Sequence, residues 1–440
     1  MVSAVAKDPN SKIVALSDLI VGRTTTFPIF DDSGVLLLAE GMVVTSEIKL
    51  NLRQRGSNRV VIHTDDVGRL TMKGKQSSSA TPLFSFDSEI TSRLDALIDS
   101  GLMTVKNTGP AVKGDVVFLG RKGYDKEQRA RLLDAHDRNG AALSDMMGDA
   151  LKGNKSDGSV VAAMATSYLK EMCADIDNTL TSTIDRFGEN DLASRSLEVA
   201  LLAMAIGIEM NLDADCIKEI GIAGLVHDWG MMKVPADYLN SSRKLNDIER
   251  LEIKKHPIYS LEMLQTVSSL PRVISVVAYQ VHECFNGSGY PRGRNGTSIH
   301  MFARILKVAD AYCALTMMRP FRPPVARYGA MECLIHQARA RSTDPDVVRA
   351  LLKVVSLFPI GSYIALSDGS VARVLRRNKE DYSRPIVLRI EDSQGQPVDE
   401  SAEENIIDLA NCDLTVVQAL PAPGTTEVLL SPELQSFHIS

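Results

Sequence analysis

Apolar residues recur every three to four positions through the middle of the chain, the period of an amphipathic helix. Two long examples cover residues 126–150 and 158–186, and the helical period dominates from residue 190 to about residue 357. Asn246 and Glu249 have the spacing of a capping box at the start of one of these helices. Alternation typical of strands occurs near both ends, in VLLLAEG and NRVVIHT and again from GSYIALSDGSVARVLRR to DLTVVQAL. The pattern predicts a mainly α protein with a small β-containing part at each end.

Changes of composition along the chain indicate where these parts begin. The segment GKQSSSATP is polar, rich in serine and ends in proline, as linkers do. We therefore expect a small α/β module over residues 1–70, a linker over 71–84, a mostly helical connecting region over 85–189, a helical bundle over 190–356 and a β-rich extension over 357–440.

Charge and composition narrow the class of partner. The 440 residues carry a formal net charge of −6, which gives no basic surface for a nucleic-acid polymer, so a phosphate-bearing partner would need a few placed cations or metals. No run of about 18 apolar residues predicts a transmembrane segment, and the N-terminus lacks the apolar core of a signal peptide. Six scattered cysteines include no CxxC pair. We expect a cytoplasmic protein that binds a small ligand.

Three histidines stand where predicted helices begin or end. The pattern DADCIKEIGIAGLVHD ends in His227 and Asp228, His256 directly precedes Pro257, and His282 follows PRVISVVAYQV. Side chains at helix ends can converge on one ion, and imidazole nitrogen and carboxylate oxygen suit divalent cations. Taken singly, each histidine also fits a capping or surface role.

An aspartate lies inside an apolar helical stripe further along. Asp310 occurs in FARILKVADAYCAL, and a buried carboxylate there needs a partner, either a metal or a cation such as Arg304 or Lys307. The intervals from Asp228 through the two later histidines to Asp310 are 28, 26 and 28 residues, each about one helix-turn-helix excursion. Several helices of a bundle can therefore present ligands to a common centre.

The motifs HD, HP, HE followed by NGSGYP, and VADAYCALTMMRPF, in this order, make residues 190–356 similar to the HD-GYP family of metal-dependent phosphohydrolases. The resemblance implies an HD-type helical bundle and hydrolysis of the bacterial messenger cyclic di-GMP to pGpG or GMP. It implies two divalent ions, iron or manganese, with a third ion in some members. The metal ligands that it implies are His227, Asp228, His256, His282 and Asp310, with Asp228 bridging two ions and central to catalysis.

The resemblance also assigns the stretch VHECFNGSGYP a role at the nucleotide. Gly289, Tyr290 and Pro291 would form a loop beside it, with glycine allowing close approach of the backbone and tyrosine offering a ring and a hydroxyl. Arg319 and Arg322 fall where the family places phosphate-binding cations. The residues alone fit an ordinary helix end and turn equally well.

Several family positions are altered. Met231 replaces a lysine, with Lys233 nearby, Val281 replaces the first of two histidines, and Arg195 stands where an upstream histidine is expected. Asp191 precedes Arg195 by four residues, so the two could pair with each other. These departures leave three functions open: a cyclic di-GMP phosphodiesterase, a catalytically degenerate receptor or scaffold that binds cyclic di-GMP or other signalling proteins, and an unrelated helical structural protein.

Overall fold

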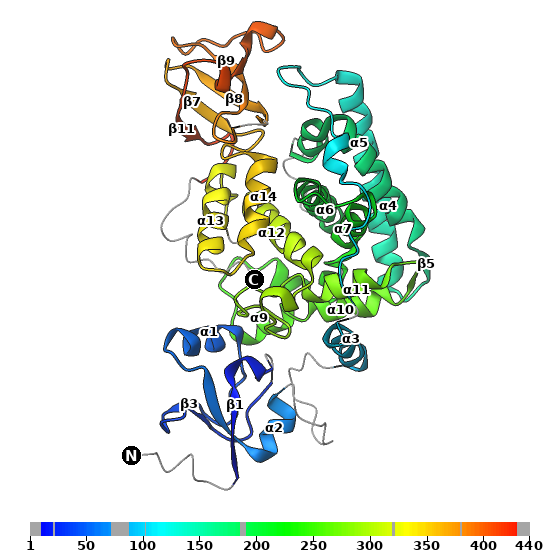
Figure 1. Cartoon of the computed structure of the whole chain (residues 1–440), viewed down its shortest axis with the longest axis vertical. Coiled ribbons are helices and arrows are strands. Elements are labelled where there is room, and N and C mark those ends of the chain that lie inside the picture. The colour runs from blue at the N-terminus through cyan, green and yellow to red at the C-terminus, as the bar shows by residue number, and fades with distance from the viewer. Residues whose placement is uncertain are drawn as a thin grey trace.

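The computed structural model describes residues 10–20, 23–71, 88–101, 103–184, 191–318, 322–378 and 381–428. It places one β-sheet at each end of an elongated molecule and a body of helices between them (Figure 1). The prediction of a mainly α protein with β-containing ends is confirmed. Within the described residues, no helix is both long and apolar enough to span a bilayer.

The N-terminal part is an antiparallel sheet with two short helices. Its strands are β1 (Ser11–Ala15), β2 (Ile29–Phe30), β3 (Leu36–Leu38) and β4 (Arg59–His63), in the order β1-β4-β2-β3. The helices are α1 (Ser46–Gln54) and α2 (Thr64–Leu70), and a 3-10 turn, η2 (Leu16–Asp18), follows β1. Buried aliphatic side chains from these strands and from α1 form a separate small core. This core gives α1 a fixed base, from which it reaches the helical body.

The helical body contains most of the buried surface. Its elements are α3 (Glu89–Asp99), η3 (Val112–Asp115), α4 (Lys126–Leu151), α5 (Ser159–Ile184), α6 (Leu192–Glu209), α7 (Ala214–Val226), η4 (Trp229–Lys233), α8 (Ala236–Leu239), α9 (Asp247–Ile253), α10 (His256–Leu264), α11 (Arg272–Gln280), η5 (Gly296–Ser298), α12 (Met301–Thr316), α13 (Arg327–Arg339) and α14 (Pro345–Val355). A short parallel pair, β5 (Ser156–Asp157) with β6 (Val267–Ser268), ties the α4–α5 turn to the α10–α11 turn. The predicted capping box of Asn246 and Glu249 is confirmed at the start of α9.

Helices α6 and α7 form the centre of this body. Nearly every residue of α6 is buried, and a Cβ added at Gly224 of α7 would lie 2.5 Å from the Cα of Ala200 in α6. Only glycine permits backbones to approach so closely. The C-terminal end of α7 is therefore held against α6, where the close packing leaves little room for movement.

The C-terminal part is a second antiparallel sheet. Strands β7 (Tyr363–Leu366), β8 (Val371–Arg376), β9 (Ile386–Glu391), β10 (Ile406–Asp408) and β11 (Val416–Leu420) run in the order β10-β9-β8-β7-β11, with the 3-10 turns η6 (Glu403–Asn405) and η7 (Leu409–Asn411). Arg376 of β8 is buried and donates to both carboxylate oxygens of Asp175 in α5, at 2.8 and 2.9 Å. Helix α5 is kinked at Asp175, which has non-helical backbone angles.

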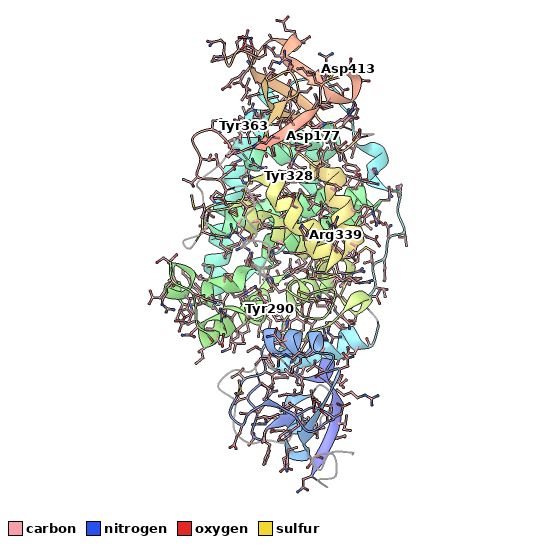
Figure 2. All side chains as sticks on the ribbon, turned by 90° about the vertical axis from the view of Figure 1, so that its left-hand side faces the viewer. Asp177, Tyr290, Tyr328, Arg339, Tyr363 and Asp413 are labelled. Atoms are coloured by element: carbon pink, nitrogen blue, oxygen red, sulfur yellow. The ribbon has the colours of Figure 1, made fainter. Side chains whose placement is uncertain are left out.

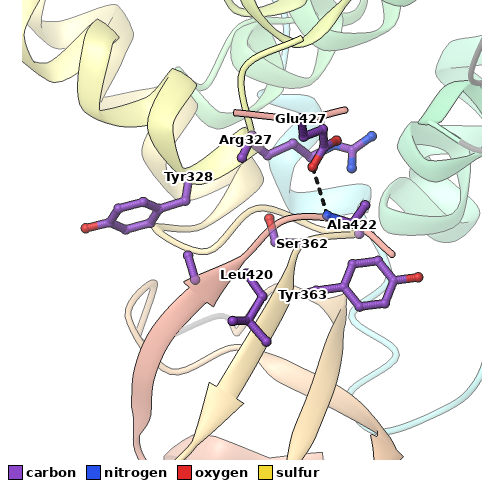
Figure 3. A pocket seen from close by; sticks show the side chains of 10 residues that line it. Arg327, Tyr328, Ser362, Tyr363, Leu420, Ala422 and Glu427 are labelled. Atoms are coloured by element: carbon purple, nitrogen blue, oxygen red, sulfur yellow. Dashed lines mark hydrogen bonds between the residues drawn. The ribbon is translucent and has the colours of Figure 1, made fainter. Parts of the chain in front are cut away.

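The sheet also meets the start of α13. Figure 3 shows a small pocket there, with Arg327 and Tyr328 on one side and Ser362 and Tyr363 on the other. The backbone N–H of Ala422 donates to the carboxylate of Glu427 beside it, at 3.1 Å. Contacts with α5 and α13 thus attach the sheet to the helical body, together with hydrogen bonds from Arg121 and Tyr124, just before α4, to carbonyls of β10 and β8.

Candidate metal centre

The five residues predicted as metal ligands lie together. His227 caps the C-terminus of α7, Asp228 follows it, His256 opens α10, His282 comes just after α11, and Asp310 lies within α12. All five are at least 95% buried. Oδ1 of Asp228 lies 3.5, 3.3 and 3.6 Å from the Nε2 atoms of the three histidines in chain order. Four separate helix segments therefore direct nitrogen and oxygen atoms at one small volume.

Hydrogen bonds to backbone carbonyls fix the orientation of two of the imidazole rings. Nδ1 of His227 contacts the carbonyl of Gly224 and Nδ1 of His256 contacts the carbonyl of Ile253, each at 2.8 Å. A carbonyl only accepts, so each Nδ1 carries the hydrogen and each neutral ring turns an Nε2 lone pair to the centre. Metal-binding histidines commonly make such a hydrogen bond through the ring nitrogen that does not bind the metal.

Two of the atoms that face the centre have no hydrogen-bond partner within the described residues. Nε2 of His227 and Oδ1 of Asp228 are buried and accept no hydrogen bond. The Nε2 atoms of His256 and His282 lie 2.7 Å apart. Burial lowers the pKa of His282 to about 3, with the nearby His256 acting in the same direction, so the His282 ring is suited to be a neutral ligand. Buried, unpaired lone pairs converging on one point fit a cation.

Neighbouring residues lock the helix ends that carry these ligands. Ser260 of α10 donates to the carbonyl of His227 at 2.7 Å and accepts from the N–H of Gly230 at 2.9 Å. A Cβ at Gly230 would lie 2.1 Å from the carbonyl oxygen of His256, so only glycine fits there. The indole N–H of Trp229 donates back to the carbonyl of Leu225. The α7 end and the α10 start are thus a single packed unit.

Asp310 has a partner that the sequence analysis did not anticipate. Nη2 of Arg195, on α6, lies 2.6 Å from Oδ1 of Asp310 and 3.4 Å from Oδ2 of Asp228. The suggestion that Arg304 pairs with Asp310 is wrong, because Arg304 pairs with Asp344 at 2.6 Å. Burial disfavours ionised Asp310, but the Arg195 guanidinium outweighs it and lowers the pKa of Asp310 to about 2.

The suggested pairing of Asp191 with Arg195 is also wrong. Asp191 is the N-cap of α6 and its carboxylate accepts from the N–H groups of Ala193 and Ser194. Arg195 instead points across to α12. The carboxylate was assigned to the wrong partner because i, i+4 spacing holds only inside a helix, and Asp191 stands just before it.

Val281, an altered position, and Lys233, which lies near the altered Met231, have clear structural roles. Val281 is fully buried in the main core, so it supplies packing and no ligand atom. Lys233 lies at the end of η4 and pairs with Glu262 at 2.8 Å, on the partly exposed side of α10. It therefore does not take over the place of the lysine that Met231 replaces.

The loop that carries Gly289, Tyr290 and Pro291 packs against the centre. The Tyr290 ring is 2% exposed and stacks on His282, with centroids 5.0 Å apart and planes within 5°. The Tyr290–Pro291 peptide bond is cis. In Figure 2, Tyr290 lies at the end of the helical body that faces the N-terminal module. One face of the ring is therefore already covered by a candidate ligand.

The expected reason for Gly289 needs correction. A Cβ at this position would lie 2.2 Å from the backbone nitrogen of Cys284 and 2.5 Å from Glu283. The close approach that requires glycine is thus to the chain's own backbone. Oε1 of Glu283 accepts from the N–H of Arg292 at 2.7 Å and closes the loop, and burial raises the pKa of Glu283 to about 7.

The two arginines assigned to phosphate have different outcomes. Arg319 lies outside the described residues. Arg322 donates to the carbonyl oxygens of Ala314, Leu315 and Pro323, on its own segment. In this arrangement its guanidinium closes the turn after α12, and contact with a phosphate would require it to leave those carbonyls.

Contacts with the N-terminal half support the loop and were missed from the sequence. Nη1 of Arg53, on α1, donates to the carbonyl of Asn286 at 2.6 Å. Asp95 of α3 accepts from Arg292 at 2.8 Å and from Arg294 at 2.9 Å. These partners are about 200 residues apart in the chain, and no local pattern marks such pairs.

Comparison with known proteins places this geometry in a family. Residues 169–347, which include all five candidate ligands, match the HD domain. The chain is 30% identical over 252 residues to "Cyclic di-GMP phosphodiesterase PA4108" of Pseudomonas aeruginosa, covering 56% of this chain and 59% of that protein. It is 34% identical over 158 residues to "3'3'-cGAMP-specific phosphodiesterase 1" of Vibrio cholerae, covering 36% of each.

Further matches are of the same kind. "Cyclic di-GMP phosphodiesterase response regulator RpfG" of Xanthomonas campestris is 33% identical over 34% of this chain and 40% of its own length. The solved structure of Bd1817, a "HDG"Y"P protein" from Bdellovibrio bacteriovorus, aligns with a TM-score of 0.44 at 14% identity, over 78% of this chain and 98% of that one. The chain spans less than two thirds of the length of each of these curated relatives.

Residues 169–347 of the helical body therefore match an HD domain, and they contain the buried cluster of histidines and aspartates. With a GYP loop packed on that cluster, and with curated relatives named as cyclic di-GMP phosphodiesterases, the chain is similar to HD-GYP proteins.

Proposed function

We propose that this chain is a metal-dependent phosphodiesterase that hydrolyses cyclic di-GMP to pGpG or GMP in a bacterial cytoplasm. The observation that carries the proposal is the buried group of Asp228, His256 and His282, whose ligand atoms all lie within 4.8 Å of one another. The relatives named as cyclic di-GMP phosphodiesterases support the choice of substrate. The relative named as specific for 3'3'-cGAMP makes that molecule the first alternative substrate to test.

Asp228, His256 and His282 would hold a divalent ion, iron or manganese, which would supply a Lewis acid for the phosphoryl oxygens and the attacking water. The chain's own residues hold and orient it. Nδ1 contacts to backbone carbonyls turn the Nε2 atoms of His227 and His256 toward the centre, and Tyr290 stacks on His282. Burial opposes ionisation of Asp228, but His227 and Arg195 keep its pKa well below the usual range, so it is a carboxylate near neutral pH. The hydrolysis adds water across one P–O3′ bond and releases the 3′-hydroxyl.

A specific observation favours a second function, that of a receptor that binds cyclic di-GMP, or engages a signalling partner, without hydrolysis. Arg195 pairs with both Asp228 and Asp310 on the side of the centre where the resemblance implies a further metal ion. A centre stripped of one ion loses part of the charge that stabilises a phosphoryl transition state.

One experiment separates the two functions. Purified protein loaded with Mn²⁺ or Fe²⁺ is incubated with cyclic di-GMP or 3'3'-cGAMP, and the products are resolved by chromatography, while binding is measured in parallel by calorimetry. A linear dinucleotide product that disappears in Asp228→Ala supports the phosphodiesterase. Binding with no product in the wild-type protein contradicts it and supports the receptor.

A further inference from the structure

We infer that the guanidinium of Arg195 fills one of two cation positions in this centre, so that the chain binds a single divalent ion, held by Asp228, His256 and His282. The inference rests on the metal site of the proposed function and specifies how many ions it holds. Two structural features support it: two groups of ligand atoms overlap at one residue, and the Arg195 side chain contacts both carboxylates of one of these groups.

The two groups share Asp228. One consists of Asp228, His256 and His282, and the other of His227, Asp228 and Asp310. Oδ1 of Asp228 faces histidines of both groups, at 3.3 Å from His256 and 3.5 Å from His227, and Oδ2 lies 3.4 Å from Arg195. A carboxylate with both oxygens turned to such groups can lie between two cations.

Arg195 contacts both carboxylates of the second group. Its Nη2 atom lies 2.6 Å from Asp310 and 3.4 Å from Asp228, so one nitrogen spans the two, as a bound ion would. In the first group, the two imidazoles and Oδ1 of Asp228 face one another, and no ion pair in the described residues joins an arginine or lysine to that oxygen. The second group therefore already contains a cation within 2.6 Å of a carboxylate oxygen, and the first group does not.

Charge and position both oppose a second ion. A guanidinium stays protonated, and the buried site holds it close to two carboxylates. A divalent ion in the second group would add two positive charges beside it, where water does not screen the repulsion. Arg195 is also fixed in place, because it sits in the first turn of α6, whose N-cap Asp191 accepts the Arg195 N–H at 3.2 Å.

A histidine at position 195 would reverse the situation. A neutral imidazole in place of the guanidinium would remove the positive charge. Asp310 and Asp228 could then bind an ion together with Nε2 of His227, which has no hydrogen-bond partner in the described residues. The Arg195→His variant is therefore expected to bind a second ion. Arg304→His is the matched control, since Arg304 is similarly buried and pairs at 2.6 Å with Asp344, on another side of α12.

The test is the metal content of protein reconstituted with excess Mn²⁺ and desalted, measured by plasma mass spectrometry, with electron paramagnetic resonance to detect coupled ions. The wild type and Arg304→His are expected to hold one ion per chain with an uncoupled spectrum, and Arg195→His two ions with a coupled one. Circular dichroism checks that each variant is folded, and Arg195→Gln, which replaces the guanidinium with a shorter neutral amide, serves if the histidine variant is not.

Two coupled ions in the wild type would overturn the inference and leave the proposed phosphodiesterase intact. A single ion in folded Arg195→His and Arg195→Gln would also overturn it, because removal of the guanidinium would then have opened no position. A wild-type protein that binds no ion contradicts the proposed metal centre itself, and the inference with it.

Discussion

The phenol ring of Tyr290 lies parallel to the imidazole of His282, with 5.0 Å between centroids. The ring is buried, and Nζ of Lys254 lies 5.4 Å from its centroid. Tyr290 therefore belongs to the wall that orients His282 toward Asp228. This relationship joins the loop motif to the metal motif, which the chain separates by a run of glycine and polar residues.

Removal of that ring is expected to weaken metal binding. Groups that orient metal ligands typically contribute about 10–100-fold in affinity, so Tyr290→Ala should raise the Kd for Mn²⁺ by about this factor. Tyr290→Phe keeps the stacked ring and should bind as the wild type does. Competition titration against a chelating dye measures both. Equal losses in the two variants would assign the effect to the hydroxyl and contradict the stacking role.

The contact from α1 to the loop predicts a local effect at a distance in sequence. Arg53→Ala removes the hydrogen bond to the carbonyl of Asn286. The free energy of local opening of residues 284–295 should fall by about 1 kcal/mol, so their amide exchange should become about fivefold faster. Arg55→Ala, at an exposed position one residue past α1, is the control and should leave exchange unchanged. Exchange measured by mass spectrometry that is the same in both variants would show that α1 does not hold the loop.

The crowding at Gly289 predicts a loss of stability. In Gly289→Ala the new methyl meets the Cys284 and Glu283 backbone, which cannot move aside as a side chain could, so the free energy of unfolding should fall by about 3 kcal/mol. Gly148→Ala, in α4 where nothing lies within 4 Å of an added Cβ, should instead gain up to about 1 kcal/mol. Urea unfolding compares the two, and an unchanged midpoint for Gly289→Ala would refute the close approach.

A buried aspartate at the junction of α5 and the C-terminal sheet predicts a pH dependence. Burial raises the pKa of Asp177 to about 6, although Arg377 and Arg376 act to lower it. The folded state then holds this proton more tightly than the unfolded chain, so the Asp177 contribution to stability falls as pH rises from about 4 to about 6.

Asp177→Asn removes this ionisation. Its unfolding free energy relative to the wild type should therefore increase by about 3 kcal/mol between pH 4 and pH 7. Chemical unfolding at several pH values measures the difference. A difference that stays constant with pH would mean that Asp177 is ionised in the folded protein throughout this range.

Local pattern was enough for the helices and for the candidate ligands. Helical periodicity located α4 and α5 almost to the residue, and the Asn246–Glu249 spacing gave a true capping box. His256 and Asp310 could be proposed because an imidazole before a proline and a carboxylate in an apolar stripe both stand out locally. Both predictions depend only on residues close by in the sequence, and such local patterns can be recognised from the sequence alone.

Pairings across the fold could not be predicted in this way. Arg195 finds Asp310 across 115 residues, and its partner depends on how α6 packs against α12. The same holds for Gly289, whose neighbour is the loop's own backbone, and for Arg322, whose acceptors are carbonyl oxygens that any sequence would provide. Such contacts are properties of the packed structure, so a single sequence carries no distinct mark of them.

The most direct test of the account is an anomalous-diffraction map of crystals grown with Mn²⁺. The account predicts one strong peak within about 2.0–2.3 Å of Oδ1 of Asp228 and the Nε2 atoms of His256 and His282. A map with no peak among those three residues, in protein that contains manganese, would contradict it.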